Sequence, residues 1–239
     1  MRLFFQIACL LLISTAVFAE TFESGPQQVP LLELFSSEGC SSCPPADEWV
    51  NSLKKDKGLW KEFVPVVFHV DYWDYLGWKD PYASPEFSQR QRRYADSWGA
   101  GSVYTPGFVL NGRELRDWKL PRPSRDPVGV LSVSTDPANG PKAIFRPAGK
   151  YQNDTGPWIV HFAVLRSGLR SDVKRGENAG RVLPHDFVVV GYSTETMRSE
   201  AGRWTAVGKP SPVKSDELAV WVTRQGDETP VQAAGGELE

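Results

Sequence analysis

The chain has 239 residues, of which 41% are hydrophobic, so it is long enough to bury a core in one large domain or two small ones. Its 27 basic and 29 acidic residues nearly cancel, and this balance gives no electrostatic signature of binding to nucleic acid or to an anionic membrane. We therefore expect a globular protein without a nucleic-acid partner.

The first residues of the chain have the pattern of an export signal. Arg2 supplies a positive start, an apolar stretch follows from Leu3 to Phe18, and Ala19 gives a small residue at the cleavage position. The apolar stretch is shorter than the roughly 20 residues that a membrane-spanning helix needs. Residues 1–19 therefore predict a secretory signal peptide, a periplasmic or secreted location and no stable membrane insertion after cleavage. A permanent membrane anchor is the alternative.

The segment after this leader alternates apolar runs with helix signals. Residues 30–35 form an apolar run with the length of a buried strand, and Phe63–Asp71 is a second such run. A helix is expected after Cys43, because Pro44 and Pro45 fit the first helical positions, where a missing N–H costs nothing.

A helix and a hairpin are expected next along the chain. The helix covers Pro85–Ser97 and carries its arginines, Arg90 among them, on its surface. Residues 107–110 then form a short strand that ends at Asn111-Gly112. This dipeptide is a strong hairpin signal, because both of its residues tolerate a positive φ.

The chain changes character near Pro121, where a linker-like stretch begins. Beyond it, short apolar or alternating runs are separated by turn residues, and no strong helix signal occurs. We expect two domains, 20–120 and 121–239, with the second a β-rich antiparallel module packed on the first. The expected strands of this module are Val128–Ser134, Ala143–Arg146, Trp158–Leu165, Phe187–Tyr192, Trp204–Val207 and Leu218–Thr223.

The cysteines give the main functional signal. Removal of the leader would take Cys9 away and leave Cys40 and Cys43, spaced as Cys-Ser-Ser-Cys, in an oxidising compartment. A cysteine at a helix N-terminus faces free N–H groups and the positive end of the helix dipole, and both lower its pKa. We therefore expect Cys40 to be the exposed nucleophile of a redox-active disulfide and Cys43 to be the less accessible resolving thiol.

Two other uses of the cysteine pair stay open. The pair could be an inert structural bridge, although a bridge across so short a loop removes little entropy from the unfolded chain. It could also bind a soft metal ion such as Cu(I), with His69 as a further ligand, although no second Cys-x-x-Cys pair completes a zinc site. Disulfide exchange is the use that we favour, and it requires no cofactor and no metal.

Three stretches around the cysteines resemble the thioredoxin superfamily: ELFSSEGCSSCPPADEWV at residues 33–50, VPVVFHVDYWDYLGWKDPYAS at residues 64–84 and VYTPGFVLNGR at residues 103–113. They are most similar to a secreted branch of that superfamily that is catalogued only as a domain of unknown function. RGENAGRVLPH, at residues 175–185, resembles a motif in the β-rich C-terminal part of that branch. The resemblance covers most of the chain beyond the leader.

The resemblance implies a thioredoxin-like fold, and so an α/β fold class, over residues 20–120. The strand pattern of residues 121–239 predicts that the antiparallel module is a sandwich. The resemblance also implies disulfide chemistry but supplies no established substrate. Our own expectation is exchange with protein or peptide thiols and a separate redox partner. Thr105-Pro106 occupies the place of the superfamily's cis-proline, so Pro106 is expected to join the catalytic centre. The backbone of Thr105 would then pair with an extended segment of the substrate.

Polar and aromatic side chains follow the second predicted strand, on the same side of the sheet as the cysteines. Trp73 and Trp78 are candidate walls of the substrate site, and His69 and Asp71 share one strand face, where they could handle protons. The alternative is structural, with tryptophans that pack and a buried histidine that is hydrogen-bonded. For His69 we favour the structural role.

Two further features have competing interpretations. Glu38 would oppose thiolate formation if it were buried beside the cysteines, but we expect it to be a solvated turn residue. Arg175–His185 is either a second functional loop or the tip of a long hairpin, rich in glycine and asparagine. The sequence as a whole predicts an exported thiol–disulfide oxidoreductase. A Cu(I)-binding protein and a non-catalytic binding module with a structural disulfide are the alternatives.

Overall fold

The computed structural model describes residues 20–120, 124–136, 138–213 and 215–238. The predicted signal peptide, residues 1–19, and the first three residues of the predicted linker lie outside the described residues. The two α-helices of the described part are α1 (Pro44–Ser52) and α2 (Pro85–Ser97). No helix in this part is both long and apolar enough to cross a membrane.

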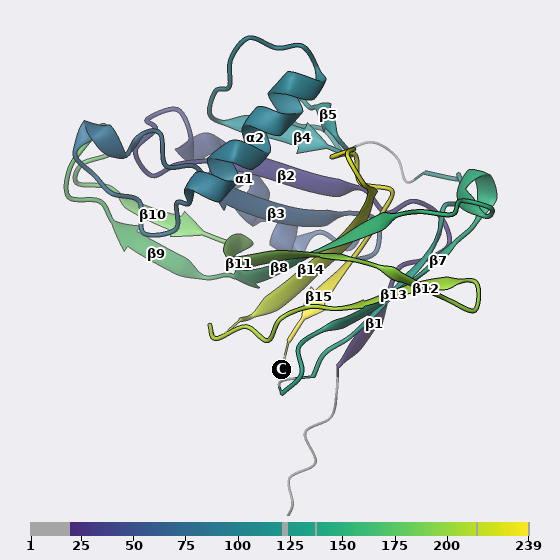
Figure 1. The fold of residues 1–239 in the computed structure, drawn as a ribbon. Coiled ribbons are helices and arrows are strands. Elements are labelled where there is room, and N and C mark those ends of the chain that lie inside the picture. Colours follow the sequence, from purple (N-terminus) through teal and green to yellow (C-terminus); the bar gives the residue numbers. More distant parts are fainter. Residues whose placement is uncertain (1–19, 121–123, 137, 214, 239) are drawn as a thin grey trace, which may run out of the picture.

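Strands dominate the described residues and form two large sheets and one two-stranded ribbon (Figure 1). The larger sheet has eight strands in the order β15-β14-β8-β11-β3-β2-β4-β5, and the smaller has five in the order β1-β6-β7-β13-β12. In chain order the strands are β1 (Thr21–Glu23), β2 (Leu31–Ser36), β3 (Val64–His69), β4 (Gly107–Leu110), β5 (Arg113–Glu114), β6 (Gly129–Ser134), β7 (Lys142–Pro147), β8 (Trp158–Arg166), β9 (Leu169–Asp172), β10 (Val182–His185), β11 (Val188–Thr196), β12 (Arg198–Glu200), β13 (Arg203–Val207), β14 (Glu217–Arg224) and β15 (Gln232–Glu237).

The expected α/β, thioredoxin-like fold class is wrong. The described chain is built mostly from β-strands in large sheets, with only two short α-helices. Strands β8, β11, β14 and β15 extend the sheet that β2 to β5 begin. Pairing between strands so far apart in the chain has no local sequence signal, which explains the error. The domain boundary at residue 120 stays a prediction.

Local structure follows the sequence pattern closely. The six runs predicted as strands beyond residue 121 coincide with β6, β7, β8, β11, β13 and β14. The hairpin between β4 and β5 is also confirmed, because Leu110 pairs with Arg113 around a two-residue turn. Asn111 has a φ of 46° and Gly112 a φ of 76°, the positive values that such a turn requires.

The two helices cover opposite faces of the parallel pair β2–β3, both of whose strands are wholly buried. Successive side chains of a strand point to opposite faces. Accordingly, Leu34 of β2 joins the core that contains Val50 of α1, whereas Phe35 joins the core that contains Tyr94 of α2. This arrangement fixes α1 and the turn before it relative to the sheet.

The surface position expected for Arg90 is wrong, because this side chain is fully buried. Its Nε donates to Oε2 of Glu33 on β2 at 2.6 Å, and its Nη2 donates to the hydroxyl of Tyr94 at 3.0 Å. Nη1 donates to Glu228 at 3.0 Å. A buried arginine is tolerated where its charge is paired and its donors are used, and the partners lie in distant parts of the chain.

The five-stranded sheet packs on the end of the large sheet that lies away from the helices (Figure 1). Leu131 and Phe145 from the smaller sheet share a core with Phe162 of β8 and Val220 of β14. The opposite face of the same strands contributes Trp221 to the core beneath α2. The large sheet is therefore covered on both faces.

Strands β9 and β10 form a ribbon that pairs only with itself in the sheet order of the described residues. The ribbon is held beside α1 through Asn51, whose Nδ2 donates to the carbonyl of Pro184 at 3.0 Å. The Oδ1 of Asn51 accepts from the backbone of Asp186 at 2.9 Å. In this way the second half of the chain reaches α1, beside which β10 lies in Figure 1.

Candidate functional site

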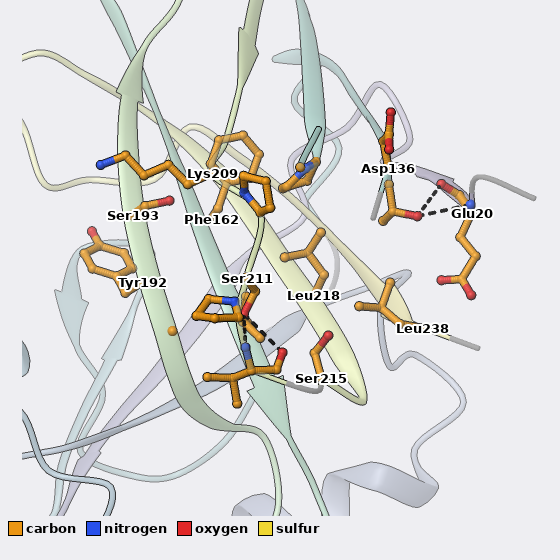
Figure 2. Close-up of a pocket in the computed structure, with 18 of the residues that line it drawn as sticks. Glu20, Asp136, Phe162, Tyr192, Ser193, Lys209, Ser211, Ser215, Leu218 and Leu238 are labelled. Atoms are coloured by element: carbon orange, nitrogen blue, oxygen red, sulfur yellow. Dashed lines mark hydrogen bonds between the residues drawn. The ribbon is translucent and has the colours of Figure 1, made fainter. Parts of the chain in front are cut away.

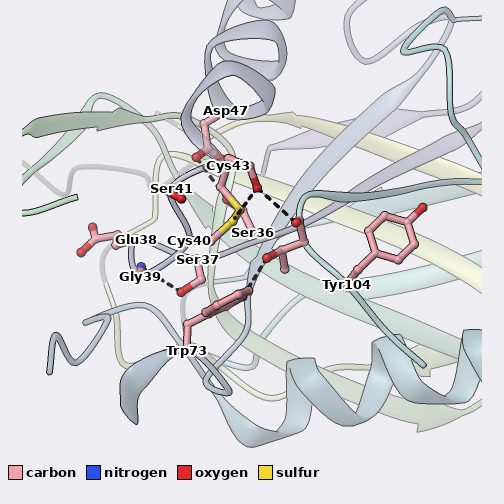
Figure 3. Close-up of a disulfide and its surroundings, with 12 residues drawn as sticks. Ser36, Ser37, Glu38, Gly39, Cys40, Ser41, Cys43, Asp47, Trp73 and Tyr104 are labelled. Carbon is pink, nitrogen blue, oxygen red and sulfur yellow. Dashed lines mark hydrogen bonds between the residues drawn. A yellow bond between two sulfur atoms is a disulfide. The ribbon is translucent and has the colours of Figure 1, made fainter. Parts of the chain in front are cut away.

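The cysteine pair lies in the turn that connects β2 to α1 (Figure 3). Cys40 and Cys43 form a disulfide with their Cα atoms 5.5 Å apart, which confirms the expected pairing. Cys43 is the N-cap residue of α1, and Pro44 begins the helix. Gly39 is required in the turn, because a Cβ there would lie 2.9 Å from the Cβ of Trp73.

Both cysteines are buried, so the expectation that Cys40 is exposed is wrong. Cys40 is 2% exposed and Cys43 is 0% exposed. The segment between β9 and β10 lies against the turn, and its Asn178 donates from Nδ2 to the carbonyl of Cys40 at 2.9 Å. Ser41 donates its backbone N–H to Oε2 of Glu177 at 3.0 Å. These contacts join residues far apart in the chain, which a local pattern does not reveal.

Glu38 is the buried centre of a hydrogen-bond network, and the expectation of a solvated turn residue is wrong. It is 1% exposed. Its Oε1 accepts from Nε2 of His185 at 3.0 Å, and its Oε2 accepts from Nε1 of Trp78 at 2.7 Å. Its backbone N–H donates to Oδ2 of Asp80 at 2.8 Å. Trp78 therefore braces the turn, and its contact with a substrate stays a prediction.

His69 lies beneath this network and is fully buried. Its Nδ1 donates to Oδ2 of Asp80 at 2.7 Å, and its ring meets that of His185 edge-on with centroids 5.0 Å apart. Burial lowers the pKa of His69, but the charge and hydrogen bond of Asp80 outweigh burial and raise it to about 9. For Asp80 the two effects have the opposite signs. Burial raises its pKa, but the charge of His69 outweighs burial, so the pKa of Asp80 lies below its usual value.

Asp71 is not the partner of His69. Its backbone N–H donates to the hydroxyl of Ser88, and that hydroxyl donates back to Oδ1 of Asp71 at 2.5 Å. Ser88 belongs to α2, so these hydrogen bonds connect the residue that follows β3 to this helix. The structure thus separates the two residues that the strand pattern places on one face.

Asp47 is a second buried acid at the site, four residues after Cys43 on α1 (Figure 3). Its Oδ2 accepts from the hydroxyl of Ser36 at 3.1 Å, and its Oδ1 has no hydrogen-bond partner among the described residues. Burial raises the pKa of Asp47 to about 6, although the charges of His69 and His185 lower it. Asp47 therefore titrates just below neutral pH.

Thr105 forms the other side of the site. The Thr105–Pro106 peptide bond is cis, as the resemblance implies, and the role of Pro106 in exchange stays a prediction. The hydroxyl of Ser42 donates to the carbonyl of Thr105 at 3.4 Å and lies 3.4 Å from Sγ of Cys40. Trp73 donates from Nε1 to Oγ1 of Thr105 at 2.7 Å (Figure 3). The structure therefore brings Thr105 and Trp73 to the cysteines.

The site combines a disulfide at the start of a helix with buried titratable side chains. The disulfide lies at a helix N-terminus, where N–H groups and the helix dipole stabilise a thiolate. Buried acid–base groups lie on its inner side, and the exposed Ser42 lies on its outer side. In the described part of the chain, no three His, Cys, Asp or Glu side chains are grouped so that they could hold a metal ion.

A separate cavity of about 730 Å³ lies far from this chemistry, over the β8, β11 and β14 strands of the large sheet (Figure 2). Its lining includes the apolar side chains of Phe162, Leu218 and Leu238 and the charged side chains of Lys209 and Asp136. Neither cysteine lines it. The disulfide is the stronger candidate for a functional site, because it carries reactive atoms and titratable neighbours and the cavity lining is mostly apolar.

Four site residues escaped the analysis of the sequence: Asp47, Asp80, Asn178 and His185. The last two belong to the 175–185 motif, for which the sequence leaves open a functional loop or a hairpin tip. Their polar character within a glycine-rich segment was the available signal. Asp80 and Asp47 gave no signal, because an aspartate in a turn or in a first helical turn is ordinarily solvated.

The geometry defines a class of protein: a β-rich fold in which a Cys-x-x-Cys disulfide is braced by a loop from the distant half of the chain. Residues 31–223 match the family described as "Protein of unknown function (DUF1223)", and the chain belongs to this family. The part of the resemblance that concerns a domain of unknown function is confirmed. The link to the thioredoxin superfamily stays a prediction.

Two solved structures are similar to this chain. Protein AGR_C_4864 from Agrobacterium tumefaciens is 28% identical, with a TM-score of 0.65 and coverage of 89% of this chain and 98% of that chain. HBP35 of Porphyromonas gingivalis is 14% identical, with a TM-score of 0.59 and coverage of 90% of this chain and 76% of that chain, and it shows a likeness of fold alone. No curated protein matches.

Proposed function

We propose that the chain is an exported thiol–disulfide oxidoreductase whose working centre is the Cys40–Cys43 pair. The observation that carries the proposal is the place of the disulfide, with Cys43 at the N-cap of α1 and Cys40 in the turn before it. A thiolate at Cys40 would face the N–H groups that begin the helix, and such a thiolate is a better nucleophile at neutral pH than an ordinary cysteine thiol.

The proposed substrates are thiols or disulfides of proteins and peptides. A partner thiolate attacks Sγ of Cys40, the bond between the two sulfurs breaks, and the electron pair leaves with Cys43, which takes up a proton. A second thiol of the partner then displaces Cys40, so that the partner is oxidised and the pair is reduced. The carbonyl of Thr105 is placed next to the cysteine turn, where it could accept a backbone N–H of an extended partner segment.

The proposal also includes a location outside the cytoplasm and a distant relationship to the thioredoxin superfamily. The leader-like residues 1–19 and the disulfide itself support a periplasmic or secreted location, because stable disulfides persist in oxidising compartments. The order of strand, Cys-x-x-Cys turn and helix supports a distant relationship of this centre to that of the thioredoxin superfamily, although the fold class differs.

Reduction potential and trapping test the proposal together. Structural disulfides of secreted proteins have potentials below about −300 mV, so we expect a higher value here. Cys43→Ser should accumulate mixed disulfides through Cys40, because no thiol remains to resolve them, and Cys40→Ser should accumulate few. A potential below about −300 mV, together with equal trapping by the two variants, would overturn the proposal.

A non-catalytic binding module with a structural disulfide is the second candidate. The burial of both sulfurs favours it, since an accessible sulfur is needed for attack. The length of the bridged loop opposes it: a bridge with a sequence separation of 3 contributes only about 2 kcal/mol by loop entropy. The potential measurement separates the two candidates.

A further inference from the structure

The segment that connects β9 to β10 lies against the turn that contains the disulfide. The ribbon belongs to neither large sheet, and its tip lies on the turn that contains Cys40. Cys40 is only 2% exposed in this arrangement, although it lies in a connecting turn ahead of the helix. The turn that contains the buried sulfur is thus held by a segment that pairs with neither large sheet.

Asn178 holds this tip in place. Its side chain is 1% exposed, and its Nδ2 donates both to the carbonyl of Cys40 at 2.9 Å and to the carbonyl of Glu38 at 2.8 Å. Arg181 donates from Nη1 to Oδ1 of Asn178 at 2.9 Å, so every polar atom of the amide is used. A fully bonded buried amide fixes the position of the backbone that carries it.

Glu177 adds a second contact at the tip. Its exposed carboxylate accepts from the backbone N–H of Ser41 at 3.0 Å, and hydrogen bonds from Ser41 lower the pKa of Glu177. This N–H belongs to the residue that directly follows Cys40 in the turn. In the closed arrangement, a negative charge therefore occupies a position that opposes the formation of a thiolate.

A glycine lies on each side of these two residues. Gly176 has a φ of 75° and Gly180 a φ of 81°, values that glycine adopts without steric cost. Gly180 has open space around the position of a Cβ. Segments that move relative to their surroundings commonly absorb the change at a few such loop residues.

We propose that residues 174–181 form a lid over the disulfide, that Asn178 is its latch, and that a partner sulfur reaches Cys40 only when the lid opens. The use of the lid by partner proteins rests on the proposed function, whereas its opening is a property of the oxidised protein alone. Asn178 and Glu177 are positioning residues, because they hold the lid against the turn and supply no reacting atom. Reduction of the disulfide should therefore be limited by the closed lid.

The test is the rate at which dithiothreitol reduces the disulfide of the exported, oxidised protein. Asn178→Ala should be reduced about tenfold faster than the wild type, because two hydrogen bonds to the turn are lost. Glu177→Ala removes an exposed acceptor with little risk to folding and should be reduced about threefold faster. Arg170→Ala, an exposed position on the same ribbon, is the matched control and should keep the wild-type rate.

Hydrogen exchange at the Ser41 amide gives a second readout, which a loss of global stability alone would not single out. Both lid variants should exchange this amide faster while the amides of β2 keep their protection. Wild-type reduction rates in Glu177→Ala and in folded Asn178→Ala would overturn the lid. The proposed function is tested separately, because failure to trap a partner leaves these rates unchanged.

Discussion

Asp47→Asn should stabilise the protein at neutral and alkaline pH. Asp47 is buried on α1, and one of its two carboxylate oxygens has no hydrogen-bond partner among the described residues. An asparagine of nearly the same shape can still accept the hydrogen bond that Ser36 donates. The substitution therefore removes a buried charge while it keeps the packing.

The size of the effect follows from the pKa of Asp47. Burial raises this pKa from 3.8 to about 6, so the folded protein binds the proton more tightly than the unfolded chain does. One pKa unit corresponds to about 1.4 kcal/mol, so ionisation of Asp47 costs the folded state about 3 kcal/mol. The cost is absent below about pH 4 and is complete above about pH 6. Asparagine avoids it throughout.

Urea denaturation between about pH 4 and pH 8 measures this difference. We expect Asp47→Asn to exceed the wild type by about 3 kcal/mol at the alkaline end and to match it at the acid end. Glu48→Gln is the control: Glu48 is exposed on the same helix, and its replacement should change stability by less than about 0.5 kcal/mol. A variant less stable than the wild type at pH 8, or a gain independent of pH, would refute the reasoning.

Two other substitutions test the buried charges. Burial lowers the pKa of His69, but Asp80 raises it to about 9, so the stability that His69 contributes is present below about pH 6.5 and is lost as the pH rises through 9. His69→Gln should lower the unfolding free energy by about 3 kcal/mol at pH 6 and abolish that decline, and a pH titration of stability that keeps it would contradict the assignment. Arg90→Leu leaves Glu33 buried without its partner and should cost about 3–5 kcal/mol in thermal or urea unfolding, whereas Arg92→Leu at the exposed helix face should cost less than about 0.5 kcal/mol.

Features with a local physical cause were predictable from the sequence. Asn111-Gly112 specifies its hairpin through the positive φ values of two adjacent residues. The strand runs of the second half follow from apolar patterns of the right length. None of these signals depends on what the segment will meet in space.

Features set by distant partners were not predictable. The choice of β3 as the neighbour of β11 and the burial of Arg90 against Glu33 both depend on segments separated by more than fifty residues. At the site, the same holds for Glu38, which would be solvated in an isolated turn. Its burial comes from His185, 147 positions away, and from the loop of Asn178. The cysteines and Thr105 could be located, but the covering residues could not.

The contact between β3 and β11 covers what would otherwise be an edge of the large sheet. It consists of one residue pair, Val67 with Val188, and the N–H of Val67 donates to the carbonyl of Phe187 at 2.9 Å. Without it, the apolar strand β3 would lie at the rim of its sheet with unpaired backbone groups, a template on which foreign strands add. Phe187, fully buried in the core beneath α1, fastens the covering strand there. The second half of the chain therefore covers an edge through which the half that carries the disulfide would otherwise be prone to edge-to-edge aggregation.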